Sequence, residues 1–162
     1  MNCENCGAPM KKGLDGESLI CEYCSSTASP EMLERQIQWL KESSSYRCPF
    51  CGESLESAAL VGAPAAGCRK CGGVLLEQEA FLEIVEMLRA QARGPGIPPR
   101  PIDPQQLQRA IRCPKCVQAM TSHPYLGPGN FIIDICDTCR LVWLDKGELT
   151  AIALAPGRDR NI

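Results

Sequence analysis

Residues 113–149 read CPKCVQAMTSHPYLGPGNFIIDICDTCRLVWLDKGEL and contain two Cys-x-x-Cys pairs with nineteen residues between them. A Cys-x-x-Cys turn, or knuckle, brings two sulfurs to one side of a tight backbone turn. Two facing knuckles supply the four thiolates of a tetrahedral zinc site. Four protein ligands leave no open position for water, so this stretch predicts a structural metal site and no metal catalysis.

The residues between and after the two knuckles predict a β-hairpin with a third strand. Residues 131–135, FIIDI, have the alternating pattern of a half-buried strand. Residues 127–130, GPGN, are typical of the preceding turn. Residues 141–144 are expected to form a third short strand after the second knuckle.

A helix is expected to follow this third strand. Asp145 is suited to the N-cap position, and Glu148, three residues later, completes a capping box. The helix is predicted to run to about Leu154 and to stop before Pro156.

The motifs in this stretch resemble a bacterial zinc-ribbon family of the transcription factor IIB type. The resemblance is carried by Cys113, Pro114, Cys116, Cys136 and Cys139, by Trp143, Leu144 and Asp145, and by Gly147, Glu148 and Leu149. It implies a small zinc ribbon with four cysteine ligands. The family usually has glycine after each knuckle, where this chain has Val117 and Arg140. These departures predict either weaker metal binding or a different arrangement of the backbone amides.

All twelve cysteines of the 162-residue chain belong to Cys-x-x-Cys pairs, and the pairs form three units. The predicted metal ligands are Cys3, Cys6, Cys21 and Cys24 in unit 1, Cys48, Cys51, Cys68 and Cys71 in unit 2, and Cys113, Cys116, Cys136 and Cys139 in unit 3. Each unit is expected to hold its own Zn²⁺, giving three ions per chain, because local closure costs the least chain entropy. Ligand sharing between units is the alternative.

Disulfide bonds are the competing use of an even number of cysteines. The N-terminal residues show no secretory signal, and no apolar run approaches the length of a membrane span. We therefore expect a cytoplasmic protein with metal-bound thiolates and no membrane association.

The fold predicted for the whole chain is a small, metal-bound α+β structure with three tandem zinc ribbons. Amphipathic helices and a Pro-rich linker are expected to join them. The predicted boundaries are unit 1 at residues 1–29, a connecting helix at 30–45, unit 2 with its C-terminal helix at 46–93, the linker with a short helix at 94–112, unit 3 with its helix at 113–155, and a flexible tail at 156–162.

Two longer helices are predicted from apolar residues at helical spacing. The connecting helix is expected to start at Pro30 and end near Glu42, with Leu33, Ile37 and Leu40 on one face. The unit 2 helix is expected at about residues 78–92, and its apolar face contains Phe81, Ile84, Val85 and Leu88. A third, short helix is expected to begin at Asp103-Pro104 and to extend over residues 107–112.

The charge of the chain argues against a broad nucleic-acid-binding surface. The formal net charge is −2, and three zinc ions with four thiolates each would lower it to about −8. The locally basic stretch offers candidate phosphate-contacting residues: Arg100, Arg109, Arg112 and Lys115. His123, the one histidine, is expected to have no functional role, and Trp143 is expected to pack the ribbon onto its helix.

Three functions are compatible with these features. The first is a non-enzymatic zinc-binding adaptor that presents apolar helices and sheet edges to a protein partner. The second is a nucleic-acid-binding or transcription-associated zinc ribbon, and the third is a thiol redox switch or an iron-bearing electron carrier. Unit 3 is the most apolar and is expected to dock on unit 2 or on a second copy, so homo-oligomerisation through unit 3 or the apolar helices is compatible with the sequence.

Overall fold

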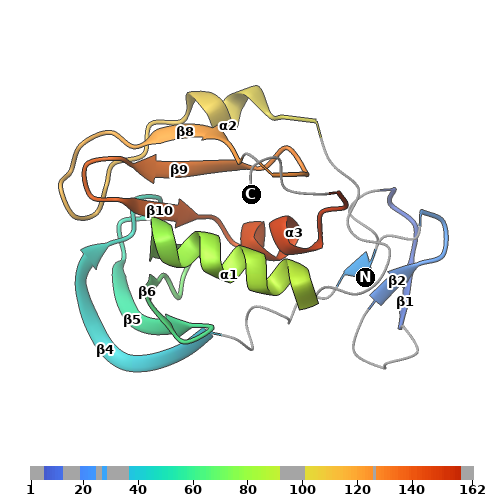
Figure 1. Ribbon diagram of the computed structural model, residues 1–162, viewed down its shortest axis with the longest axis horizontal. Coiled ribbons are helices and arrows are strands. Elements are labelled where there is room, and N and C mark those ends of the chain that lie inside the picture. Colours follow the sequence, from blue (N-terminus) through green and yellow to red (C-terminus); the bar gives the residue numbers. More distant parts are fainter. Residues whose placement is uncertain are drawn as a thin grey trace.

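A computed structural model describes residues 6–12, 19–24, 27–28, 37–91, 101–125 and 127–157. These residues form a seven-stranded antiparallel sheet, a smaller three-stranded sheet near the N-terminus, and three helices (Figure 1). The predicted α+β class is therefore confirmed. Residues 94–100 of the predicted linker lie outside the described residues.

The elements follow the chain in a simple order. The small sheet contains β1 (Met10–Lys12), β2 (Leu19–Cys21) and β3 (Thr27–Ala28). The large sheet contains β4 (Ile37–Arg47), β5 (Ser54–Leu60), β6 (Ala63–Gly67), β7 (Val74–Glu77), β8 (Thr121–Pro124), β9 (Ile132–Cys136) and β10 (Leu141–Leu144), in the spatial order β4-β5-β6-β7-β10-β9-β8. The helices are α1 (Gln78–Gln91), α2 (Pro104–Gln108) and α3 (Glu148–Leu154).

Units 2 and 3 meet where β7 pairs with β10. Leu75 lies opposite Trp143, and each of these residues is the fourth after the last cysteine of its unit. Equivalent residues therefore face each other across an antiparallel pair, which relates the two units by an approximate twofold axis. The expectation that unit 3 docks on unit 2 is confirmed, and the contact is a continuous sheet.

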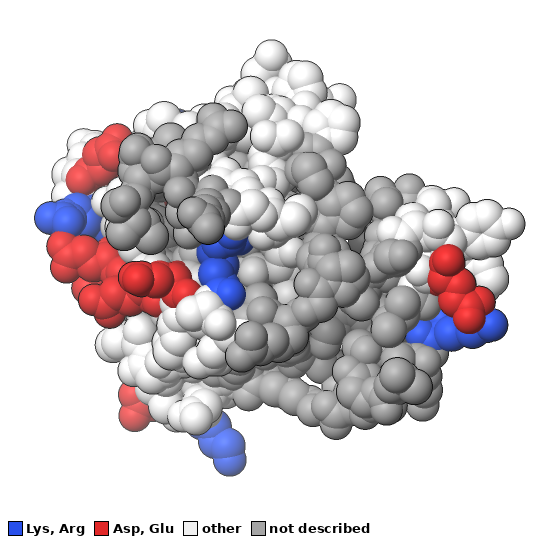
Figure 2. All heavy atoms as spheres, turned by 45° about the vertical axis from the view of Figure 1, so that its right-hand side comes forward, with Lys and Arg blue, Asp and Glu red and all other residues white. Residues whose placement is uncertain are grey.

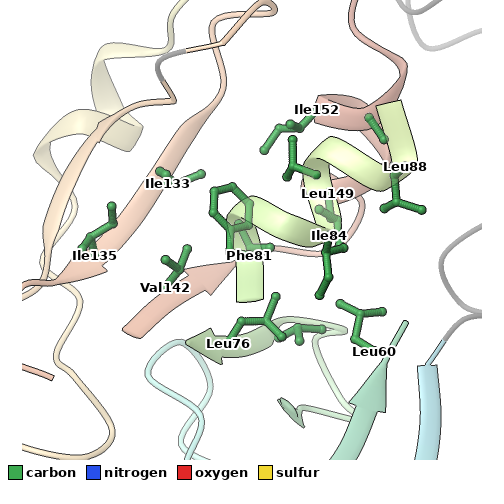
Figure 3. Close-up of a cluster of buried hydrophobic side chains, with 14 residues drawn as sticks. Leu60, Leu76, Phe81, Ile84, Leu88, Ile133, Ile135, Val142, Leu149 and Ile152 are labelled. Atoms are coloured by element: carbon green, nitrogen blue, oxygen red, sulfur yellow. The ribbon is translucent and has the colours of Figure 1, made fainter. Parts of the chain in front are cut away.

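One face of the large sheet is covered by α1 and α3. The side chains between this face and the two helices form the helix-side core, shown in Figure 3: Leu60, Val74, Leu76, Phe81, Ile84, Val85, Leu88, Ile133, Ile135, Val142, Leu144, Leu149, Ile152 and Ala153. The apolar face of α1 is buried as its sequence spacing predicts.

The opposite face of the sheet packs against cysteines. The thiolate-side cluster consists of Cys48, Leu55, Ala66, Cys68, Leu75, Ile111, Cys113, Met120, Cys136, Leu141 and Trp143. Successive residues of a strand point to opposite faces, so Val142 belongs to the core and Trp143 to the cluster. Trp143 is buried, but the prediction that it packs the ribbon onto its helix is wrong, because it points away from both helices.

The predicted half-buried strand at residues 131–135 is also corrected. Every residue of β9 is buried, because the helices cover one face of the sheet and the thiolate-side cluster covers much of the other. A polar residue at position 134 suggested a solvent-facing side, but Asp134 has an exposed fraction of 0%. The partners of its carboxylate are described below.

The connecting helix predicted at residues 30–45 is wrong over residues 37–45, which lie in β4. Residues 30–36 lie outside the described residues. Ile37 and Trp39 are half-buried while Gln38 and Leu40 are exposed, which is the period of a strand. The ring of Trp39 lies close to Gly67 in β6, and the Arg69 guanidinium stacks on it at 3.9 Å from the ring centroid. Pairing with β5 and these contacts override the local helical spacing.

The two shorter helices differ from their predicted limits. The side chain of Asp103 caps α2 as expected, but α2 ends at Gln108 instead of Arg112, because Arg109 has an extended backbone and turns toward unit 3. α3 ends at Leu154 as predicted but begins at Glu148 after Gly147. Half of the capping box forms: the Glu148 carboxylate accepts from the Asp145 backbone N–H at 2.8 Å. The Asp145 side chain makes no cap.

The start of the predicted flexible tail is held by α1. The Arg89 guanidinium donates to the carbonyls of Ile152, Ala155 and Gly157, at 2.8, 3.0 and 2.7 Å respectively. These bonds satisfy carbonyls at the end of α3 and place a positive charge there, where a helix dipole favours it. Residues 156 and 157 are therefore anchored, and residues 158–162 lie outside the described residues.

The seam between the units leads to a test of packing. A Cβ atom at Gly73 would overlap the buried indole of Trp143, with Cη2 at 2.7 Å. We expect Gly73→Ala to lower the free energy of unfolding by about 1–3 kcal/mol through overpacking. Urea unfolding of the metal-loaded protein at fixed free zinc measures this change.

The matched control for this substitution is the Trp143→Leu background, since leucine is the residue that unit 2 has at the equivalent position 75. There the added methyl group has room, and Gly73→Ala should cost less than about 0.5 kcal/mol. Equal costs in the two backgrounds would show that the indole is not what excludes a side chain at residue 73.

Candidate metal centres

Units 2 and 3 each bring four cysteine sulfurs together. In each cluster the Sγ atoms lie within 4.8 Å of one another, and two of the four cysteines are buried. Sγ–Sγ distances are 3.5 Å for Cys48–Cys71, 3.4 Å for Cys51–Cys68 and 3.6 Å for Cys116–Cys136. A zinc–sulfur tetrahedron has edges of about 3.8 Å, whereas a disulfide has about 2.05 Å. Both donor sets fit zinc, and these cysteines form no disulfides.

Unit 1 presents a third cluster. Cys6, Cys21 and Cys24 have their sulfurs within 4.8 Å of one another, with 3.4 Å between Cys6 and Cys21. Cys3, the predicted fourth ligand, lies outside the described residues. Leu19 and Ile20 lie in β2, which brings Cys21 to the cluster. Three clusters can therefore hold metal, and the third needs one more ligand to match the other two.

The knuckles keep one backbone conformation whether or not glycine is present. Gly52 has a φ of +75°, and its equivalent Val117 has +64°. Gly72 has +75°, and its equivalent Arg140 has +55°. The N–H groups of Gly52 and Val117 donate to the carbonyls of Cys48 and Cys113. The amide after the first knuckle is therefore not rearranged in unit 3, and the side chains at residues 117 and 140 are accommodated with backbone strain.

Backbone hydrogen bonds and burial act on the thiols in opposite directions in the metal-free protein. A hydrogen bond from the backbone of Gln118 lowers the pKa of Cys116 to about 7. Burial raises the pKa of Cys48 well above its ordinary value, although its sulfur accepts from the N–H of Cys51. Metal binding must displace the protons of such buried thiols, so the metal affinity should increase with pH.

An arginine stabilises the first knuckle in both units. Arg47 and Arg112 each precede the first cysteine of their unit, and each donates at 3.2 Å to the carbonyl of the residue after the knuckle, Gly52 or Val117. Each also pairs with a residue shortly after the knuckle, Arg47 with Ser54 and Arg112 with Ala119. Repeated bonds of this kind give Arg112 a structural role that the sequence analysis missed.

Of the other predicted phosphate-contacting residues, Arg109 and Lys115 lie in the described part of the chain and differ in exposure. Lys115 is exposed, Arg100 lies outside the described residues, and the Arg109 side chain is only 17% exposed. Arg109 is paired with two carboxylates of unit 3, Asp134 and Asp145. His123 belongs to none of the metal-ligating clusters found among the described residues.

Arg109 is the centre of a polar network inside unit 3. Its Nε and Nη2 donate to Asp134, and its Nη1 donates to Asp145. Ser122 also donates to Asp134, and the Trp143 indole Nε1–H donates to Asp145 at 3.1 Å. Burial would lower the pKa of Arg109, but these carboxylates outweigh it and raise the pKa. In the sequence, this network is indicated by Asp134, a lone aspartate in the apolar run FIIDI. A buried carboxylate needs a cation or several hydrogen-bond donors, so its position predicts such partners.

Glu148 adds a third carboxyl group near this network. Burial raises its pKa to about 8, although the hydrogen bond from the Asp145 N–H opposes the shift. The charges of Asp145 and Asp134 act in the same direction as burial, whereas Arg109 opposes them. Glu148 is therefore largely protonated in the folded protein at neutral pH.

Comparison with known proteins agrees with this geometry for unit 3. Residues 112–155 match the model of a zinc-ribbon family of the TFIIB type, described as a transcription factor zinc-finger. This stretch is a zinc-binding zinc ribbon, and the resemblance inferred from its motifs is confirmed there. Searches of curated proteins and of solved structures found no match. Among the described residues, no helix has the length and apolar character needed to cross a membrane.

The strained position after the first knuckle of unit 3 predicts an unusual glycine substitution. Val117→Gly removes the strain of a β-branched residue at positive φ, which stabilises the folded state by about 1–2 kcal/mol. The greater freedom of glycine in the unfolded chain opposes this by about 0.5–1 kcal/mol. We expect the net effect to stabilise folded unit 3 by about 0.5–1 kcal/mol. A competing chelator should therefore remove zinc from this unit less readily than from the parent. Val117→Ala keeps the Cβ atom and should gain less. Faster zinc loss from Val117→Gly than from the parent would contradict this account.

The raised pKa of Glu148 predicts a pH-dependent stability difference. The folded carboxyl holds its proton up to pH 8 or so, while the unfolded one loses it near 4.5. This group therefore makes the free energy of unfolding fall as the pH rises between those two values. Glu148→Gln keeps an oxygen for the Asp145 N–H and lacks this titration. The free energy of unfolding of Glu148→Gln, relative to that of the parent, should therefore increase by about 1–2 kcal/mol from pH 6.5 to 8.5.

Urea unfolding of the zinc-loaded proteins at both pH values measures this difference. The effect of pH on metal binding is common to parent and variant and cancels. Glu83→Gln on the exposed face of α1 is the control and should show no such growth. A Glu148→Gln advantage that is the same at both pH values would refute the proposed protonation.

Proposed function

We propose that the protein is a non-enzymatic adaptor in which three tandem zinc ribbons present rigid turns to a protein partner. In this proposal all three cysteine clusters bind Zn²⁺, with Cys3 completing unit 1. Four thiolates per ion leave no coordination position for a substrate, so the metal would hold the shape of the binding surface and take no part in chemistry.

The observation that carries this proposal is the exposure of apolar side chains on the metal-binding turns. Tyr23 lies in the second knuckle of unit 1 and is 89% exposed; Phe50 lies in the first knuckle of unit 2 and is 66% exposed. Val117 follows the first knuckle of unit 3 and is 63% exposed. Large apolar side chains held on rigid turns are suited to fill pockets of a protein partner.

Nucleic-acid binding is the second candidate function, favoured by the description of the family that residues 112–155 match. Two of its four proposed contact residues, Arg109 and Arg112, already bond within unit 3. Figure 2 shows one face of the molecule, on which acidic side chains lie beside basic ones without a broad basic area. These features support the protein-binding proposal over phosphate contacts, which need clustered positive charge.

Affinity capture from the native cell tests the two functions together. The zinc-loaded full chain is used as bait, with and without nuclease, and both captured protein and captured nucleic acid are measured. A Phe50→Ser variant, altered at an exposed position, tests the contribution of this apolar side chain to capture. The adaptor proposal expects a stoichiometric protein that survives nuclease and is reduced by Phe50→Ser. Capture that depends on nucleic acid, or that yields no stoichiometric protein, would contradict it.

A further inference from the structure

Unit 3 contains a buried site that binds a guanidinium group, occupied in this structure by Arg109. Asp134 is fully buried and accepts from two nitrogens of Arg109, with 3.3 Å between Nε and Oδ1. Asp145 accepts from the third nitrogen and is itself oriented by the Trp143 indole. Ser122 orients Asp134 from the neighbouring strand β8. The site thus has two fixed carboxylates and two side chains that hold them in place.

Unit 2 shows that the fold of a unit does not require this site. Asp134 stands two residues before the third cysteine of unit 3, and the equivalent residue of unit 2 is Ala66. Arg109 stands four residues before the first cysteine, and its equivalent is Ser44. Ala66 is buried in the thiolate-side cluster without a charge. Apolar side chains often replace buried ion pairs without loss of stability, so the charges in unit 3 point to a role beyond folding.

The segment that carries Arg109 lies on the surface of unit 3, with α2 against β8. None of the residues of α2 is buried, and Leu107 is exposed. Two residues after Arg109, Ile111 is buried and its carbonyl accepts from the Met120 N–H at 2.8 Å. Residues 101–108 therefore contribute no buried side chain to unit 3, and the Arg109 guanidinium is the charged attachment that follows them. Moving this short segment would vacate the carboxylates.

We propose that Asp134, Asp145 and Ser122 form an arginine-recognition site of unit 3, which receives an arginine side chain of a protein partner when Arg109 withdraws. Arg109 acts as the intramolecular competitor for this site. The inference rests on the proposed adaptor function and names the chemistry of one partner contact. Since Asp145 and Arg109 are both partly exposed, the site can be reached from the surface along the path that Arg109 now takes.

The geometry selects arginine over lysine. Three nitrogens of one planar group point at two separate carboxylates, and the pair formed with Asp134 is bidentate. An ammonium group presents its donors from a single point and cannot match this arrangement. A competitor in the same chain has a high effective concentration, so the site should bind external arginine weakly until Arg109 is removed.

The test uses the zinc-loaded full chain with Arg109→Ala and the parent protein. The probe is Nα-acetyl-arginine amide, and the matched control is Nα-acetyl-lysine amide at equal ionic strength. Binding is followed by NMR through the indole N–H resonance of Trp143, which reports on Asp145. We expect a saturable shift in Arg109→Ala, at least tenfold weaker binding in the parent, and loss of binding in Arg109→Ala/Asp145→Asn. Should Arg109→Ala unfold, the arginine amide is expected to restore the folded spectrum.

Three results would overturn the inference. They are the absence of both binding and rescue, equal binding of the lysine amide, and binding to the parent as tight as to Arg109→Ala. Affinity capture then separates the inference from the adaptor function: Arg109→Ala should retain more of the partner than the parent. If a partner is captured but the arginine amide does not bind, only the inference fails. If the amide binds and no partner is captured, the adaptor function fails.

Discussion

Two four-thiolate clusters close the face of the large sheet that the helices leave open, and the rest of the structure depends on this. Cys48, Cys68, Cys113 and Cys136 are buried in the same cluster as Leu75 and Trp143, the pair at the centre of the seam. A sheet of this size in a short chain needs cover on both faces to bury its strands. The helices supply one layer, and the metal-binding knuckles supply much of the other.

The seam between β7 and β10 makes one body of two similar units. Equivalent residues meet there, as they do in a symmetric dimer, but the chain connects the halves and has let them diverge. Unit 2 continues its sheet with β4, whereas unit 3 has α2 and the Arg109 network at the corresponding place, and in Figure 1 α2 runs beside β8. The features that both units have, the knuckles and the paired strands, serve the fold. The features that only one unit has, such as the Arg109 network, are where the binding functions of the two units can differ.

Short-range patterns in the sequence predicted the parts of the fold that depend on local chemistry. The cysteine spacing predicted the clusters, and the third strand of unit 3 was predicted directly after its second knuckle. The spacing of Phe81, Ile84, Val85 and Leu88 predicted the buried face of α1. The spacing of Leu33, Ile37 and Leu40 predicted a helix where β4 forms, because pairing with β5 and the contacts of Trp39 are not visible in a local window. Only part of the candidate site was foreseen for the same reason.

Arg109 and Asp134 are 25 residues apart, and no local rule pairs them. In its local sequence Arg109 belongs to a basic stretch and Asp145 suits a helix cap. The fold instead brings both to one polar network, where the guanidinium balances the negative charge of the buried Asp134 and the partly exposed Asp145. Long-range electrostatic pairs of this kind become visible only when the arrangement of the strands is known.

The most direct test of this account is native mass spectrometry of the full chain, combined with an NMR spectrum before and after zinc removal. The account predicts three zinc ions per chain and loss of the dispersed Trp143 indole resonance once the ions of units 2 and 3 are chelated. A chain that carries far fewer than three ions, or that keeps its folded spectrum after all metal is removed, would contradict it.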